Sequence, residues 1–344
     1  MISTIIPERY NLENLSRVLR NPSILLREPK NIKRDLVYYP NRSVGRWKFH
    51  RKYGEGIDIM EHDWDNLIIL DACRYDFFEA VNWLEGSLNS VVSRGSHSRD
   101  FVDSNFRGRS LHDTVYVSGN VKAADLSDDV FHKRVLTYSK TYSTDEYSAF
   151  KERYERYSPE AVYELAVQNY HKHEDKRFIV HFMQPHCPYL GEKAEQLRER
   201  LTEEHGLRFK AWESLENYDE DALYTNHLLS AFEEGYGTRE ELEEVYEENL
   251  ELVLEFVANL LEELEGKTVI TADHGELLGD PTNFYYFGRK YAHIKDVYIP
   301  ELRVVPWLKI EGERRREITA EDPLETDEID PDVLDEQLEA LGYI

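Results

Sequence analysis

Acidic and imidazole side chains directly follow two short apolar runs of the sequence, where they could bind a metal ion. Asp71 comes after the run NLIIL, and the adjacent pair Asp273 and His274 comes after the run at residues 268–271. Two carboxylates and one imidazole can share a single cation and leave a position open for a hydroxyl or a substrate oxygen. Each residue alone has another explanation, because an Asp after a strand often caps the next helix. Together they predict a site for one divalent metal ion, with ligand types that suit Mn²⁺, Zn²⁺, Mg²⁺ or Ca²⁺.

Two further segments offer groups that could act on a substrate. His186 lies between two prolines in the turn QPHCPY, which could hold its imidazole toward the metal site. The alternative for this histidine is a structural role, hydrogen-bonded beside an apolar strand. Residues 93–100 (SRGSHSRD) form a hydroxyl-rich turn. A serine hydroxyl is a poor nucleophile unless a base or a metal lowers its effective pKa, and the predicted cation would fill that role.

Arg74 and Arg99 are candidates for binding an anionic substrate. A guanidinium group pairs with phosphate or sulfate oxygens through two parallel hydrogen bonds. The chain contains 68 acidic residues, so ion pairs with carboxylates are the alternative for both arginines.

The elements that must position these residues follow an α/β pattern. Apolar runs alternate with helical spacing, which predicts a mostly parallel central sheet sandwiched by helices. Strands are expected at residues 66–70, 90–93, 114–118, 178–183, 268–271 and 302–310, and helices at 159–173 and 238–266. The polar stretch 191–237 is interpreted as an insertion with its own helices. In open sheets of this kind, ligands bind just beyond the carboxyl ends of the strands, where we expect the candidate residues to meet.

Four sequence blocks resemble the alkaline phosphatase superfamily, specifically its sulfatase-like branch. They are ILDACRYD, QPHCPY, TADHGELLGD and YAH followed by LRVVPWL, in the order and at roughly the spacing of that family, and the closing LEALGYI is also similar. The resemblance covers roughly residues 60–344, which are expected to form one catalytic domain. Residues 1–59 are then a basic N-terminal arm outside it.

The resemblance implies a metal-dependent hydrolase or transferase of phosphate or sulfate esters, with a glycan or a lipid head group as the candidate substrate. In this family a metal-bound side chain attacks the ester and forms a covalent intermediate. Asp71, Asp273 and His274 match the ligands of the nucleophile-side metal. His186 and His293 match histidines that face the ester oxygens, and His293 could protonate the leaving oxygen.

Departures from the family pattern indicate a site with one metal ion and argue against a formylglycine residue. Neither Cys73 nor Cys187 lies in the Cys-x-Pro-x-Arg block that sulfatases oxidise to formylglycine. Two-metal members place an Asp and a His where this chain has His186 and Leu190. Ala72 stands where sulfatases usually have a second Asp. A single-metal site with a serine nucleophile remains.

Ser96 is the serine that the resemblance favours, as both nucleophile and metal ligand. In members similar to lipoteichoic acid synthases, an acidic residue and an aromatic residue follow the nucleophile at the fourth and fifth positions. Asp100 and Phe101 follow Ser96 in this way. Ser98 is the second choice and His97 the third.

A second hypothesis is a catalytically degenerate binding protein on the same fold. Ala72 and the unusual turn GSHSRDF would then be signs of lost activity. The complete set of Asp, His and Ser candidates favours the enzyme over this alternative.

The charge of the chain is acidic overall and uneven along its length. A net charge of −26 disfavours a nucleic-acid partner bound through a general basic surface. Acidic composition with few lysines suits a halophilic protein working in high salt, and an ordinary acidic cytosolic enzyme is the alternative. Residues 9–52, however, hold twelve basic and three acidic residues.

This basic segment predicts one of two contacts. Its interleaved apolar residues would let it lie peripherally on an anionic membrane surface or on a phosphorylated ligand, or it could wrap the acidic body of the same chain. The start of the chain lacks the pattern of a signal peptide, and no apolar run approaches the ~20 residues that span a bilayer. We therefore expect a cytoplasmic protein, peripheral at the membrane if the segment binds lipid.

Overall fold

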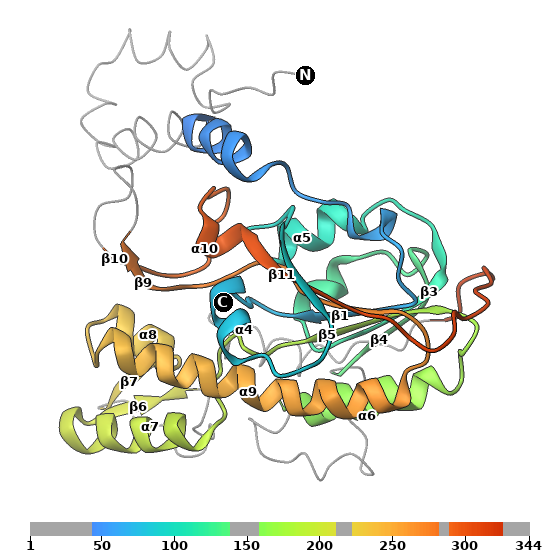
Figure 1. Cartoon of the computed structure of the whole chain (residues 1–344). Helices are drawn as coiled ribbons and strands as arrows, with labels where there is room; N and C mark the ends of the chain where they lie inside the picture. The colour runs from blue at the N-terminus through green and yellow to red at the C-terminus, as the bar shows by residue number, and fades with distance from the viewer. Residues whose placement is uncertain (1–42, 138–157, 211–221, 282–288, 326–344) are drawn as a thin grey trace, which may run out of the picture.

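The computed structural model describes residues 43–137, 158–210, 222–281 and 289–325, and Figure 1 shows them as coloured ribbon. A seven-stranded sheet lies at the centre, in the order β2-β11-β8-β1-β5-β3-β4. Its strands are β1 (Asn66–Leu70), β2 (Ser87–Val92), β3 (Leu111–Ser118), β4 (Phe131–Leu136), β5 (Arg177–Phe182), β8 (Thr268–Ala272) and β11 (Val304–Ile310). Neighbouring strands are parallel except at β11, which is antiparallel to β8 and β2. The predicted α/β fold with a mostly parallel sheet is confirmed.

The three central strands have the continuous apolar sequences expected of strands covered on both faces. Every residue of β1 and of β8 is buried. The strands are in register, so that Leu70 lies beside Phe182 of β5 and beside Ala272 of β8. The residues that follow these three strand ends therefore come together at one edge of the sheet.

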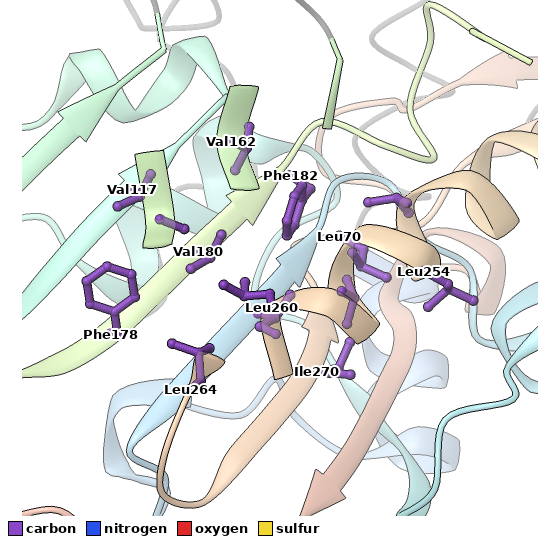
Figure 2. Close-up of a cluster of buried hydrophobic side chains, with 14 of the residues drawn as sticks. Leu70, Val117, Val162, Phe178, Val180, Phe182, Leu254, Leu260, Leu264 and Ile270 are labelled. Atoms are coloured by element: carbon purple, nitrogen blue, oxygen red, sulfur yellow. The ribbon is translucent and has the colours of Figure 1, made fainter. Parts of the chain in front are cut away.

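Helices cover both faces of the sheet. On one face, Ile68 and Leu70 pack with α4 (Tyr75–Val81), α6 (Pro159–Tyr170) and α9 (Arg239–Glu263). Figure 2 shows part of this cluster, including Val162 of α6 and Leu254 of α9. On the other face, the alternate residues of β1 pack with α5 (Ser98–Asn105) and with the short 3-10 helices η2 (Ile59–Glu61) and η3 (Val121–Asp125).

The two predicted helices are present as α6 and α9. The side chain of Ser158 caps α6 by accepting a hydrogen bond from the backbone N–H of Glu160. Thr238 and Glu241 form the predicted capping box of α9. Buried residues recur along α9 at spacings of three and four, which gives the helix one apolar face for the sheet.

The polar stretch 191–237 contributes helices and a small sheet. Helices α7 (Glu192–His205) and α8 (Leu228–Glu233) lie in it, together with the parallel pair β6 (Leu207–Phe209) and β7 (Leu223–Thr225). These elements share a separate apolar cluster with α9 and with the hairpin of β9 (Leu277–Pro281) and β10 (Arg289–Ala292). The short helix α10 (Pro300–Arg303) precedes β11. Pro300 at the first turn favours this helix, so the strand expected from residue 302 begins at Val304 instead.

Most of the predicted basic arm, residues 1–42, lies outside the described residues, as does the block LEALGYI near the end of the chain. Residues 43–53 are helical. Within the described ranges, no helix combines the length and the apolar composition needed to cross a bilayer.

Asp58 joins the N-terminal part of the structure to the sheet, and replacing it should lower stability. Its side chain is 4% exposed and forms ion pairs with Arg94 and Arg109. Burial alone would raise the pKa of this carboxyl, but the hydrogen bonds and charges of the two arginines and the N–H of Met60 hold it below the usual range.

We expect Asp58→Asn to reduce the free energy of unfolding by about 2 kcal/mol at pH 7, less than for a fully buried pair because the arginines are part-exposed. The pKa is lowered on folding, so this contribution is complete above about pH 4 and is lost as pH falls through the lowered value. Urea unfolding at pH 7 and pH 3 measures both effects. The exposed Glu255→Gln on α9 is the matched control. Equal losses of unfolding free energy in Asp58→Asn at pH 7 and pH 3 would contradict a role for the charge of Asp58.

Candidate metal centre and active site

The ends of β1 and β8 bring two carboxylates and one imidazole together in the interior of the molecule. Asp71 directly follows β1, and Asp273 and His274 directly follow β8. All three are buried. The Nε2 atom of His274 lies 3.6 Å from Asp71 Oδ1 and 3.3 Å from Asp273 Oδ2. The structure therefore brings together the three metal ligands that the sequence predicted.

Backbone N–H groups fix Asp273 so that one carboxylate oxygen is left for the site. Its Oδ1 accepts hydrogen bonds from the N–H of Ala72, at 3.0 Å, and of His274, at 2.8 Å. Ala72 can donate from this position because its backbone is in the left-handed region, with a φ of 59°. Asp273 Oδ2 has no hydrogen-bond partner among the residues that the structure describes.

His274 is held in the tautomer that suits a metal ligand. Its Nδ1 lies 2.8 Å from the carbonyl oxygen of Gly275 and donates a hydrogen bond to it, which leaves the lone pair of Nε2 directed at the carboxylates. Burial lowers the pKa of His274 to about 4, although Asp273 raises it, so the imidazole is neutral near pH 7. The loop is tight at Gly275, where a Cβ atom would lie 2.1 Å from the carbonyl oxygen of Glu301.

Ser98, and not Ser96, faces this group. Ser98 is the first residue of α5, and its Oγ lies 3.2 Å from His274 Nε2 and 3.4 Å from Asp71 Oδ2. The side chain of His97 caps the helix by accepting from the N–H of Asp100. Ser96 Oγ instead accepts a hydrogen bond from the N–H of Asp296 at 3.0 Å. The structure places the second-choice serine beside the predicted ligands.

Asn120 completes the surroundings of Ser98. It lies just beyond the end of β3, and its Nδ2 donates to Ser98 Oγ at 3.0 Å and to Asp71 Oδ2. The amide thus holds the hydroxyl and the carboxylate in fixed positions. Since Nδ2 is a donor only, Ser98 can direct its own proton toward Asp71.

The donor set fits a divalent cation. Within the described part of the chain, Asp71 Oδ1 and Asp273 Oδ2 are buried without hydrogen-bond partners, and such atoms are costly unless something neutralises them. Burial and the charge of Asp273 raise the pKa of Asp71 well above its usual range, as expected for two unneutralised carboxylates in one site. Ligands about 2.1 Å from a tetrahedral ion are roughly 3.4 Å apart. His274 Nε2 lies 3.2 to 3.6 Å from Ser98 Oγ, Asp273 Oδ2 and Asp71 Oδ1, which matches that spacing.

His181 is a further donor beside the same carboxylates. It lies on β5, and its Nε2 atom is 3.9 Å from Asp273 Oδ2. Asp71, His181 and Asp273 form one group of potential ligand atoms that lie within 4.8 Å of one another. The Nδ1 atom of His181 pairs with the hydroxyl of Tyr116 at 2.8 Å, and Nε2 has no hydrogen-bond partner.

The two predicted substrate-facing histidines lie together around a buried carboxylate, Glu276. His186 Nε2 is 3.8 Å from Glu276 Oε2, and His293 Nδ1 is 3.3 Å from Glu276 Oε1. The rings of His293 and His274 are 4.6 Å apart, so this group adjoins the first. Burial lowers the pKa of His186. Burial also acts to lower the pKa of His293, but Glu276 outweighs it and raises that pKa above the usual value.

The turn that carries His186 is fixed from two sides. The N–H of His186 donates to the carbonyl oxygen of Asp71 at 3.1 Å, which ties the turn to the end of β1. Asn249 on α9 donates to the carbonyl oxygens of Pro185 and His186, both at 3.1 Å. His186 Nδ1 donates to the carbonyl oxygen of Cys187 at 2.6 Å and leaves Nε2 facing Glu276.

The two predicted anion-binding arginines are already paired with carboxylates. Arg74 is buried and forms ion pairs with Asp76 and Asp280, 2.6 and 2.8 Å away. Arg99 is exposed and pairs with Asp125 at 2.8 Å. Both arginines therefore form ion pairs with carboxylates, which was the alternative to anion binding.

Three residues of the two groups were not among the predicted site residues: Asn120, His181 and Glu276. Each had a signal in the sequence. Asn120 follows a strand end, as Asp71 does, and His181 lies one residue before the end of β5. Glu276 is two residues after His274 inside the block TADHGELLGD.

Comparisons with known proteins give structural neighbours only. No protein-family model and no curated protein matches the sequence. Three solved structures have a similar arrangement. The zinc complex of the C-terminal periplasmic domain of EcEptC from Escherichia coli is 12% identical, with a TM-score of 0.40 and 75% of each chain covered.

The C-terminal periplasmic domain of phosphoethanolamine transferase EptC from Campylobacter jejuni is 13% identical, with a TM-score of 0.42, 72% of this chain covered and 78% of that one. Lipooligosaccharide phosphoethanolamine transferase A from Neisseria meningitidis is 12% identical, with a TM-score of 0.41 and 86% of this chain covered. The match spans 60% of that integral membrane protein.

Proposed function

We propose that this chain is a metal-dependent transferase or hydrolase of phosphate esters that uses Ser98 as its nucleophile. The observation that carries the proposal is the position of Ser98 Oγ, within 3.4 Å of both His274 Nε2 and Asp71 Oδ2, beside two buried carboxylate oxygens that lack partners. A divalent cation held by Asp71, Asp273, His274 and Ser98 would lower the pKa of the hydroxyl and offset negative charge on the phosphoryl oxygens. The separations near 3.4 Å favour Zn²⁺ among the candidates, followed by Mn²⁺.

The first step forms a bond between Ser98 Oγ and phosphorus and breaks the bond from phosphorus to the leaving alcohol oxygen. The hydroxyl proton passes to Asp71 Oδ2, the acceptor 3.4 Å away, and from there to water. Asn120 steadies Oγ during the attack, and the N-terminus of α5 favours the charge that develops there.

His293 is the proposed acid for the leaving oxygen. Its pairing with Glu276 favours the protonated imidazole, which gives its proton to the departing alkoxide. In the second step, water or an acceptor alcohol attacks phosphorus, and neutral His293 removes the proton of that nucleophile. The bond from Ser98 Oγ to phosphorus then breaks, and Ser98 regains a proton from water by way of Asp71 Oδ2.

The choice between water and an alcohol acceptor is proposed to depend on the insertion. Leu228, Leu229 and Phe232 of α8 share an apolar cluster with Leu278 of β9. The partly buried Ala292, at the end of β10 and directly before His293, packs against the same cluster. The insertion thereby supports the segment that presents the proposed acid, and its shape would decide which acceptor reaches the phosphoryl group.

A screen of metals against substrates tests the proposal. The protein, stripped with a chelator, is assayed with Zn²⁺, Mn²⁺, Mg²⁺ or Ca²⁺ on aryl phosphate monoesters, phosphodiesters and sulfate esters. We expect turnover only with added metal, with Zn²⁺ or Mn²⁺ most effective and phosphate esters preferred over sulfate. Metal-independent turnover would contradict the proposal. Metal-dependent binding of phosphate without turnover of any ester would support the degenerate binding protein instead.

A further inference from the structure

The helix at residues 43–53 packs on the body of the protein through one side only. Phe49 is 4% exposed and its ring lies 6.1 Å from that of Tyr298, while the ring of His50 lies 5.4 Å from Tyr298. Tyr298 precedes α10, in the segment that follows His293. Figure 1 shows this helix in blue, above α10. Packing through Phe49 and His50 fixes which face of the helix remains in solvent.

The opposite face combines cations with exposed apolar side chains. Val44 is 40% exposed and Trp47 is 59% exposed, although large apolar side chains are usually buried. Lys48, Arg51 and Lys52 are also exposed. The spacing of three and four residues puts all five side chains on one face of the helix, away from Phe49. This set of five residues is called the basic aromatic face.

No acidic residue of the described ranges pairs with the cations of the basic aromatic face. Elsewhere, exposed arginines such as Arg99 and Arg314 pair with carboxylates. Lys48, Arg51 and Lys52 form no ion pair with any residue of the described ranges. Arg51 instead lies over the ring of Trp47, 5.6 Å from its centroid. In a chain with 68 acidic residues, this helix therefore keeps its positive charge available for an external anionic partner.

We propose that the basic aromatic face binds the surface of an anionic lipid bilayer. Charge alone would also suit a polyanion such as heparin or DNA, but an exposed Trp and Val among the cations favour an interface with an apolar interior. Trp places its ring at the level of the lipid head groups, and each nearby Lys or Arg strengthens binding to an anionic leaflet about fivefold. The face is a binding surface in its own right and does not depend on the proposed reaction.

Vesicle sedimentation with the full chain tests this proposal. Vesicles of phosphatidylcholine alone are compared with vesicles that contain about one third phosphatidylglycerol. We expect at least tenfold tighter binding to the anionic vesicles at low salt and weakening as salt is raised. Lys48→Glu/Lys52→Glu should weaken that binding at least tenfold. The matched control Lys172→Glu/Lys193→Glu makes the same charge change at exposed positions of other segments and should alter it less than twofold.

Fluorescence reports whether the aromatic side chain enters the interface. The anionic vesicles should shift the tryptophan emission to shorter wavelength in the wild type, and Trp47→Phe, which leaves four of the five tryptophans, should remove most of that shift. Equal vesicle binding by Lys48→Glu/Lys52→Glu and the wild type would overturn the proposal. So would binding to heparin or DNA without binding to the vesicles. Circular dichroism checks that each variant remains folded.

Discussion

Ser98→Ala is expected to lower turnover of phosphate esters at least about 1000-fold, whereas Ser96→Ala should leave it within about tenfold of the wild type. The two serines are only two residues apart and both are buried, but their surroundings differ. Ser98 Oγ lies against His274 Nε2 and Asp71, and removing a nucleophile removes the covalent route altogether. Ser96 Oγ accepts a hydrogen bond from the N–H of Asp296, and its loss costs about 1 kcal/mol of stability.

Intact-mass spectrometry of protein quenched during turnover separates the two serines directly. The wild type and Ser96→Ala should gain the mass of one phosphoryl group, and Ser98→Ala should gain none. Ser98→Thr keeps a hydroxyl at the site and should restore part of the lost activity. A phosphoryl group on Ser96, or full activity in Ser98→Ala, would assign the nucleophile to Ser96, which is the serine that the family resemblance favours.

The central sheet could be predicted from the sequence because burial on both faces leaves a continuous apolar run. The runs at β1 and β8 were predicted to within one residue of their ends. β4 (FHKRVL) was missed because polar residues interrupt its apolar pattern. It lies at the edge of the sheet, where Arg134 donates hydrogen bonds to the carbonyl oxygens of Ala123 and Leu126. Tertiary hydrogen bonds of this kind are invisible to a periodicity argument.

The site residues that directly follow a strand could be predicted from the sequence. Asp71 and Asp273 have no freedom to lie elsewhere, because the registers of β1 and β8 place them side by side. The choice between Ser96 and Ser98 depends instead on where α5 begins. His97 takes the capping position and turns Ser98 into the site.

The sequence could not decide between the two interpretations of Arg74 for another reason. The spacing of residues along the sequence does not show which carboxylates compete for a guanidinium group. Asp280, which pairs with Arg74, lies 206 residues away in the sequence. Long-range pairing in an acidic chain therefore has to be read from the structure.

Asp273→Asn is expected to abolish metal binding and activity while leaving the metal-free protein at least as stable as the wild type. The Oδ1 atom of asparagine can still accept from the N–H groups of Ala72 and His274. Its NH₂ group would replace Oδ2, 3.3 Å from His274 Nε2, and could donate to that lone pair. The substitution also removes the charge that raises the pKa of Asp71, so about 1 to 3 kcal/mol of repulsion and unsatisfied burial is relieved.

Thermal unfolding with and without metal distinguishes this outcome from simple damage to the fold. Metal at 100 times its dissociation constant should stabilise the wild type by about 2.7 kcal/mol and should not shift the variant. The exposed Glu255→Gln makes the same carboxylate-to-amide change on α9 and should behave as the wild type does. The carboxylates of Asp71 and Asp273 are buried beside each other, and the charge of Asp273 raises the pKa of Asp71. A variant that is less stable without metal, yet still stabilised by it, would therefore show that Asp273 is a structural residue and not a ligand.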